Sequence, residues 1–169
     1  MKKRIFSGFS LIELLVVITI FALLGVLITF SLAFSMKGGK KSESINKVRG
    51  NLDYAISVME RQLRNADEIV YGCQQSSYIT YKDQKGVEAS FSLDTSEDLR
   101  RIASSSGDFN KTYLTSDDVF VDRLNFDCMP AEKGATDSVK IEIIAHDAKA
   151  SGVESAKVTV ETRINLRNY

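Results

Sequence analysis

The chain has 169 residues, 44% of them hydrophobic, and its 22 basic and 22 acidic residues cancel to a formal net charge of zero. This length suits one modest domain plus a membrane element. Residues 1–41 hold six of the basic residues and one acidic residue, which leaves 16 basic and 21 acidic residues, a net charge of about −5, in residues 42–169. Nonspecific DNA or RNA binding needs a positive surface, so this balance argues against a nucleic-acid-binding protein.

A long apolar segment follows the N-terminal residues. Residues 14–34 are 21 residues without a formal charge. As a helix rising about 1.5 Å per residue they reach roughly 30 Å, enough to cross a bilayer. Cations flank both ends, so the positive-inside count is indecisive: Lys2, Lys3, Arg4, Lys37, Lys40 and Lys41. We nevertheless expect the short basic N-terminus to stay in the cytoplasm while the larger C-terminal part is exported.

One carboxylate, Glu13, lies at the start of this apolar segment. A carboxylate in a lipid core costs on the order of 2–3 kcal/mol, so such residues usually have a partner. An uncleaved signal anchor explains the length and the flanking charges but leaves Glu13 unexplained. A cleaved secretory signal fits poorly, because the small residues Ser7 and Gly8 precede the apolar stretch and no A-x-A-like site follows it.

The N-terminal residues Lys-Lys-Arg, followed by Gly8-Phe9-Ser-Leu-Ile-Glu13-Leu-Leu-Val16, resemble the class III signal of type IV prepilins and type II secretion pseudopilins. The resemblance implies that a membrane-embedded prepilin peptidase cleaves between Gly8 and Phe9 and methylates the new amino group of Phe9. It also implies that many such helices pack into a filament core. The implied partners are other pilin or pseudopilin subunits and an inner-membrane assembly platform.

Cleavage would supply the partner that Glu13 needs. The new Phe9 amine of one subunit and Glu13 of a neighbouring subunit would form a charge pair inside an apolar bundle. Removing one member of a buried pair costs around 3–5 kcal/mol, so the pair would act mainly as a register device. The alternative is a tolerated carboxylate close enough to the headgroups to reach them.

From Ser42 the pattern changes to an amphipathic helix. Apolar residues recur at steps of three and four: Ile45, Val48, Leu52, Ala55, Met59, Leu63, Ala66 and Ile69 or Val70. Gly38 and Gly39 precede this stretch and are the best candidates for a bend or local melting of the helix. A coiled-coil stalk is the weaker alternative, since only about three heptads are present and a β region follows.

The C-terminal part alternates with a period of two residues, which is typical of strands that bury one face. The predicted strands cover residues 87–93, 119–128, 139–143 and 156–166, with a weaker one at 77–81 and a bulge at Asp122-Arg123 where the parity changes. We expect loops at residues 94–98, 104–110 and 128–137. The amphipathic helix is available to cover the apolar face of this sheet.

These elements predict an α+β fold, a long N-terminal helix packed on an antiparallel β-sheet, as the resemblance to pilins also implies. The expected parts are a leader peptide at residues 1–8, a membrane and filament-core helix at 9–36, an amphipathic helix at 37–70 and a β-sheet domain at 71–169. The stretch "MERQLRNA" and the final "VTVETRINLRN" look like minor pilins of the W type and pseudopilins of the J type.

Two cysteines, Cys73 and Cys128, lie in the part expected to be exported. In an oxidising compartment we expect one disulfide, which would close a loop of about 56 residues and stabilise the fold by at most roughly 4 kcal/mol. The alternative is two unpaired buried thiols.

Other chemistry is sparse in the sequence. His146 is expected to be a solvated residue at a loop edge, and the acidic stretch Asp94, Glu97, Asp98 to be a charged turn rather than a calcium site. With no metal motif, phosphate loop or nucleophile elbow, we expect no cofactor and no catalysis. The favoured function is a structural minor subunit of a type IV pilus or type II secretion pseudopilus, located first in the bacterial inner membrane with its C-terminal domain outside. The alternatives are a DNA-uptake or adhesive minor pilin with a ligand site on the β domain, and a signal-anchored periplasmic hydrolase.

Overall fold

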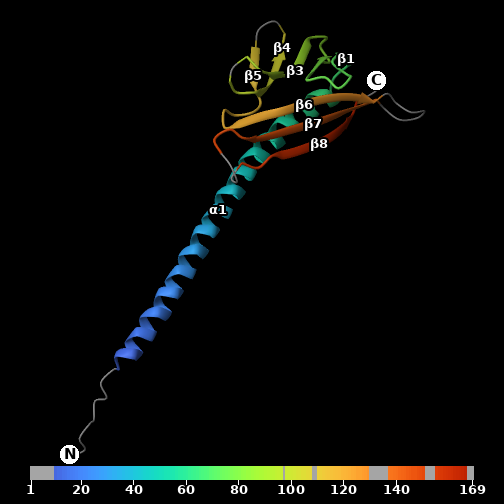
Figure 1. The fold of residues 1–169 in the computed structure, drawn as a ribbon. Helices are drawn as coiled ribbons and strands as arrows, with labels where there is room; N and C mark the ends of the chain where they lie inside the picture. The colour runs from blue at the N-terminus through green and yellow to red at the C-terminus, as the bar shows by residue number, and fades with distance from the viewer. Residues whose placement is uncertain (1–9, 97, 108–109, 130–136, 151–154, 167–169) are drawn as a thin grey trace, which may run out of the picture. The chain divides into compact units, whose positions relative to one another are not determined.

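The computed structural model describes residues 10–96, 98–107, 110–129, 137–150 and 155–166. The chain divides into two compact units, residues 1–40 and residues 41–169, and each is described by itself. The first unit contributes the beginning of helix α1 (Leu11–Arg64), and the second contains the rest of this helix and all the strands (Figure 1).

Helix α1 has 54 residues and begins after Ser10, whose carbonyl accepts a hydrogen bond from the Leu14 N–H at 3.1 Å. Among the described residues, it is the one helix that is long and apolar enough to cross a membrane. The backbone stays helical through Gly38 and Gly39, where the sequence predicted a bend or local melting.

The second part of α1 buries the face that its sequence pattern predicted. Its buried residues are Ser44, Val48, Leu52, Ala55, Ile56, Met59 and Leu63. All of these except Ser44 contribute to one hydrophobic core with side chains from the strands, among them Phe91, Ile102, Phe126 and Ile141, which have no exposed surface. The predicted α+β fold, with the helix packed on antiparallel sheets, is therefore present.

The helix ends earlier than predicted. We expected the amphipathic helix to reach residue 70, but α1 ends at Arg64. The N–H groups of Asn65 and Ala66 bond three residues back, to the carbonyls of Gln62 and Leu63, which tightens and ends the last turn. The N–H of Asp67 then donates to the Lys82 carbonyl at 2.9 Å, so the chain joins the sheet at this point.

The strands form two antiparallel sheets (Figure 1). The first has five strands in chain order, β1 (Glu68–Tyr71), β2 (Tyr78–Lys82), β3 (Glu88–Asp94), β4 (Arg101–Ser106) and β5 (Asn110–Tyr113). The second has three, β6 (Val119–Met129), β7 (Ser138–Asp147) and β8 (Val158–Asn165). An isolated antiparallel bridge between Ser76 and Phe126 links the two sheets.

The predicted bulge is confirmed, because the pairing of β6 with β7 shifts register between Val121 and Arg123. All three predicted loops are wrong in part. Asp94 belongs to β3, Ser104–Ser106 belongs to β4, Asn110 begins β5, and Cys128 and Met129 belong to β6. The serines of β4 were predicted to be a loop because the second half of "RIASSS" has no apolar residue to alternate. Its pairing with β3 places Ile102 opposite Leu93 and Ser104 opposite the buried Phe91.

Polar bonds on both flanks of α1 fix it to the sheets. Lys47 pairs with the buried Asp147 at the end of β7, with 3.1 Å between Nζ and Oδ2. The hydroxyl of Thr162 in β8 donates to Glu60 at 2.7 Å, and the Tyr81 hydroxyl in β2 donates to Gln62 at 2.5 Å. The helix therefore contacts strands of both sheets through specific bonds as well as through the core.

We expect Gly72→Ala to lower the free energy of unfolding by more than the roughly 1–2 kcal/mol that a left-handed φ costs a non-glycine residue, because the added Cβ would also collide with backbone. Gly72 has a φ of +91°, and an added Cβ would lie 2.1 Å from the Tyr78 carbonyl oxygen. Gly86→Ala is the matched control, since Gly86 also has a positive φ, +76°, but no atom within 4 Å of its Cβ position. Thermal unfolding of the detergent-solubilised chain measures both, and equal losses would contradict the close approach at Gly72.

The fold should lose stability in alkali through Tyr81. Its burial, with a smaller contribution from the Asp83 charge, raises the pKa of Tyr81 to about 12 from 10.0. The folded state therefore holds this proton more tightly than the unfolded state, so the stability gained is present below pH 10 and is lost between about pH 10 and pH 12. Unfolding of wild type and Tyr81→Phe across this range measures the effect, and identical pH slopes would refute it.

Candidate functional site

The first turn of α1 holds the carboxylate that the sequence singled out. Glu13 lies in this turn, where a negative charge interacts favourably with the helix dipole. Ser10 and Glu13 also have the spacing of a capping box, a signal that the sequence analysis did not consider. However, no side-chain hydrogen bond joins these two described residues to each other's backbone. Capping of the N-terminus of α1 therefore does not involve the Glu13 carboxylate.

The surroundings of Glu13 on the helix are apolar. Val16, Val17 and Ile20 lie three, four and seven residues later and so share its side of the helix. Among the described residues, no hydrogen bond or ion pair reaches Glu13. The next charged residue along α1 is Lys37, 24 positions away. Within its own chain the carboxylate thus has no described partner and no charged neighbour along the helix.

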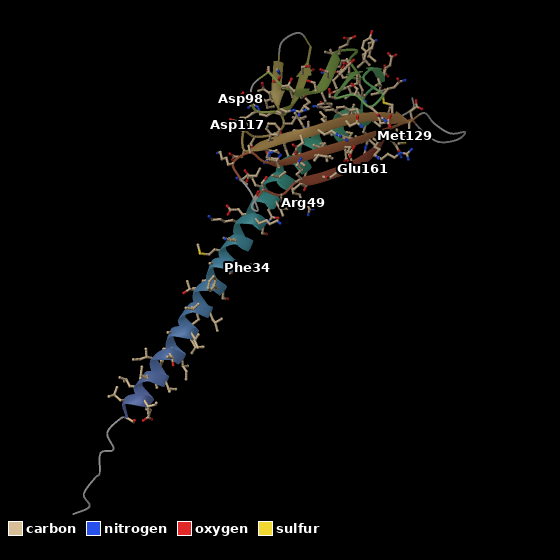
Figure 2. The ribbon with its side chains drawn as sticks, viewed as in Figure 1. Phe34, Arg49, Asp98, Asp117, Met129 and Glu161 are labelled. Atoms are coloured by element: carbon tan, nitrogen blue, oxygen red, sulfur yellow. A yellow bond between two sulfur atoms is a disulfide. The ribbon has the colours of Figure 1, made fainter. Side chains whose placement is uncertain are left out.

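The apolar surface around Glu13 is exposed along the described part of the first unit, from Leu11 to Met36. The large hydrophobic side chains from Leu11 to Met36 are between 39% exposed, at Val17, and 82% exposed, at Phe34. Figure 2 shows these side chains projecting from α1 on all sides. The hydroxyls of Thr19 and Thr29 donate to the carbonyls of Val16 and Gly25, each at 2.8 Å, so they need no outside partner. Such a surface suits a lipid or a protein interior.

The two residues expected to be processed, Gly8 and Phe9, lie outside the described residues. Cleavage between them and methylation of Phe9 therefore remain predictions. The structure likewise gives no distance between Phe9 and Glu13.

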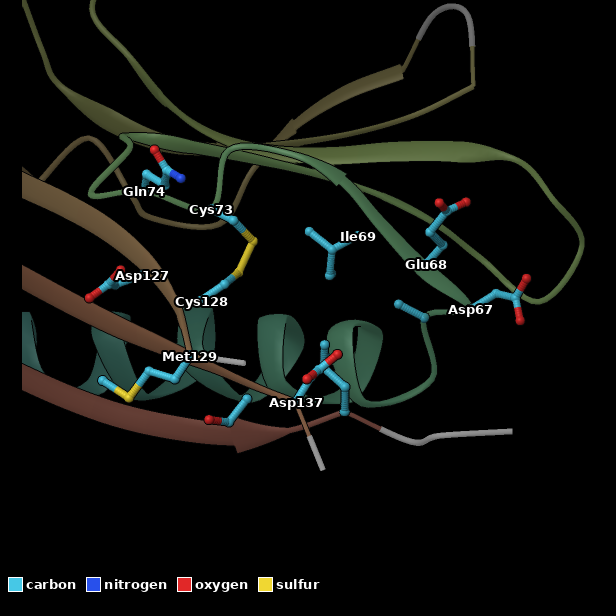
Figure 3. Close-up of a pocket in the computed structure, with 12 residues that line it drawn as sticks. Asp67, Glu68, Ile69, Cys73, Gln74, Asp127, Cys128, Met129 and Asp137 are labelled. Atoms are coloured by element: carbon cyan, nitrogen blue, oxygen red, sulfur yellow. A yellow bond between two sulfur atoms is a disulfide. The ribbon is translucent and has the colours of Figure 1, made fainter. Parts of the chain in front are cut away.

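In the second unit, a disulfide joins Cys73 to Cys128 with a Cα–Cα distance of 4.8 Å. It connects the segment after β1 to the end of β6, and the Cys128 N–H donates to the Cys73 carbonyl at 3.3 Å. Figure 3 shows this disulfide at the wall of an open hollow of about 520 Å³. Ile69 and four carboxylates also line the hollow: Asp67, Glu68, Asp127 and Asp137.

The acidic stretch considered for calcium is occupied by internal bonds. Asp94 pairs with Lys111 and also accepts hydrogen bonds from Ser96 and the Tyr113 hydroxyl, which together hold the pKa of the Asp94 carboxyl well below its usual range. Asp98 is exposed, and Glu97 lies outside the described residues. In the described part of the chain, no group of three or more His, Cys, Asp or Glu residues could hold a metal ion.

His146 is placed differently from the expectation of a solvated loop edge. It belongs to β7, its Nδ1 lies 2.9 Å from Asp122 Oδ2, and its ring packs on Phe120 with 5.1 Å between centroids. The prediction failed because Asp122 is the bulged residue of β6, and a bulge turns a side chain toward a neighbour that simple alternation does not indicate. This contact explains the histidine as part of the sheet.

The comparison with known families agrees with the N-terminal segment. The prokaryotic N-terminal methylation motif matches residues 3–29, which include Gly8, Phe9 and Glu13. No curated protein and no solved structure matches the chain. The similarity to W-type minor pilins or J-type pseudopilins stays a prediction.

The match confirms the resemblance that the sequence analysis found in residues 2–16. The motif implies processing by prepilin peptidase and assembly with other pilins, and it supports a structural role. Together with the uncovered apolar part of α1, it fits a protein anchored in a membrane. The chain thus carries the prokaryotic N-terminal methylation motif and is, in this segment, similar to type IV prepilins and pseudopilins.

Proposed function

We propose that this chain is a structural minor subunit of a type IV pilus or type II secretion pseudopilus. It enters the inner membrane as a prepilin, with its C-terminal domain on the periplasmic side. Prepilin peptidase then removes residues 1–8 and methylates Phe9, and the assembly platform adds the subunit to a filament. The observation that carries the proposal is Glu13, a carboxylate with no partner among the described residues, on an exposed apolar stretch of helix inside the methylation motif.

Assembly proceeds by lateral packing of these apolar helices. Within a bundle, the methylated Phe9 amine of one subunit neutralises Glu13 of the next. A stagger that separates the two leaves a buried charge uncompensated, at a cost of around 3–5 kcal/mol. The pair therefore selects one stagger among many that apolar contact alone would allow. The minor role is supported by the similarity of residues 59–66 and of the final strand to W-type and J-type proteins.

The mature protein should begin at Phe9. We expect its intact mass, measured on protein from cells, to lack residues 1–8 and to include one added methyl group. Gly8→Val should keep the leader, because the motif places a small residue at the cleavage point. A wild-type protein that still begins at Met1 would contradict the processing step.

Glu13 should be required after processing rather than for it. We expect Glu13→Ala to be cleaved and methylated normally but to fall at least about tenfold in sheared filaments, since it leaves the Phe9 amine buried alone. Glu88→Ala is the matched control, because Glu88 is an exposed carboxylate on β3 rather than on α1. Quantitative immunoblotting of filament and membrane fractions measures both variants. Wild-type filament content for Glu13→Ala would remove the register role.

A further inference from the structure

In the second unit, one side of α1 is covered by the sheets and the other is bare. Val48, Leu52 and Met59 have no exposed surface on the covered side. The exposed residues recur at helical spacing on the other side, and we call them the outer face of α1: Glu43, Asn46, Arg49, Gly50, Asp53, Tyr54, Ser57, Arg61 and Arg64.

Two opposite charges on the outer face have no partner. Arg49 and Asp53 are exposed, and among the described residues no ion pair or hydrogen bond involves either side chain. They lie four residues apart and so are neighbours on the helix surface. Within one helix, a cation that precedes the acid is the weaker order for such a pair. Both charges therefore remain available to a neighbouring molecule.

The same face carries an open space and a projecting ring. An added Cβ at Gly50 would meet no atom within 4 Å, so the backbone is bare at this point. Tyr54, four residues later, is a large side chain that is 59% exposed. The distance between two packed helices depends on the side chains at their contact, and a glycine allows close approach there. Gly50 thus leaves room on the helix surface for an aromatic ring, such as that of Tyr54, from a neighbouring molecule.

The charges and the shapes share one offset of four residues, about 6 Å along a helix. We propose that the outer face of α1 packs in parallel against the outer face of a second copy of this chain displaced by four residues. Arg49 of one copy then meets Asp53 of the next, and Tyr54 of the next copy covers Gly50 of the first. The complementarity of charge and the fit of ring to glycine both select this occupant and this displacement.

Such a contact suits a filament. Residue n of one copy meets residue n + 4 of the other, so the interface is heterologous and continues from copy to copy without closing. The inference rests on the proposed function, because the same offset separates Phe9 from Glu13, and it extends the register into the folded domain. A minor subunit makes this contact wherever two of its copies are neighbours in the filament.

Exchanging charges between copies tests the contact. We expect Arg49→Asp alone and Asp53→Arg alone each to lower filament content about tenfold, because each places like charges together. Co-expressing the two variants in one cell should restore incorporation to within about twofold of wild type, since each copy then meets the opposite charge on the other. An ion pair within one helix cannot be restored by mixing. Arg123→Asp, a charge reversal at an exposed arginine of β6, should have no effect.

Photo-crosslinking locates the same contact without changing a charge. A benzophenone amino acid in place of Tyr54 should join two copies in cell membranes and filaments, with the cross-linked peptide containing residue 50. The same probe in place of Tyr71, which is 64% exposed on β1, should not produce this product.

The outcomes separate the two proposals. Three results would each overturn the outer-face contact while leaving the proposed function intact. They are wild-type filament content for Arg49→Asp, failure of co-expression to restore the two variants, and cross-links from position 54 that reach only lipid or another protein. Absence of the wild-type chain from filaments would overturn the proposed function. In that case the cross-links formed in membranes, between position 54 and a peptide containing residue 50, would still test the outer-face contact.

Discussion

The constraint on which the rest depends is the exposed apolar surface of the first part of α1. From Leu11 to Met36, every large hydrophobic side chain is exposed, and Glu13 stands among them with no described partner. No rearrangement of side chains within this helix removes that surface from water. Lipid before assembly and the helices of other subunits after assembly would each remove this surface from water. The first part of α1 is therefore suited to both environments in turn.

The second part of α1 meets the opposite requirement. It has a narrow apolar side that its own strands cover, and its flanks make specific bonds to them. Lys47 reaches the buried Asp147, which would be costly to leave without a cation, and Glu60 and Gln62 bond to β8 and β2. One secondary-structure element therefore serves assembly along one stretch of sequence and the internal fold along the next.

The parts of the fold that depend on local periodicity could be predicted from the sequence. The apolar steps from Val48 to Leu63 and the parity change at Asp122 gave the buried helix face and the bulge. Features that depend on partners distant in sequence could not be predicted. Helix α1 stops at Arg64 because Lys82 offers a strand carbonyl to Asp67, and the serines of β4 are strand residues because β3 pairs with them. At the candidate site, the motif identified Glu13, and the helical period placed Arg49 and Asp53 between the apolar positions. That these two charges have no partner among the described residues became visible only in the structure.

The carboxylates of this chain divide into two groups with different physical meanings. Asp94, Asp122 and Asp147 each have a partner within the chain, and their role in the fold accounts for them. Glu13 and Asp53 have no partner among the residues that the structure describes, but the cost of leaving each charge unpaired differs. Glu13 lies among apolar side chains, where an unpaired charge is expensive once water is removed, so its pairing can decide whether assembly occurs at all. Asp53 is solvated on a polar face, where an ion pair contributes about 1 kcal/mol or less. Its pairing with Arg49 would therefore contribute little to the affinity between copies. Like charges brought together at a wrong stagger would still repel. The charges of Arg49 and Asp53 would therefore act mainly by selecting the stagger between neighbouring domains.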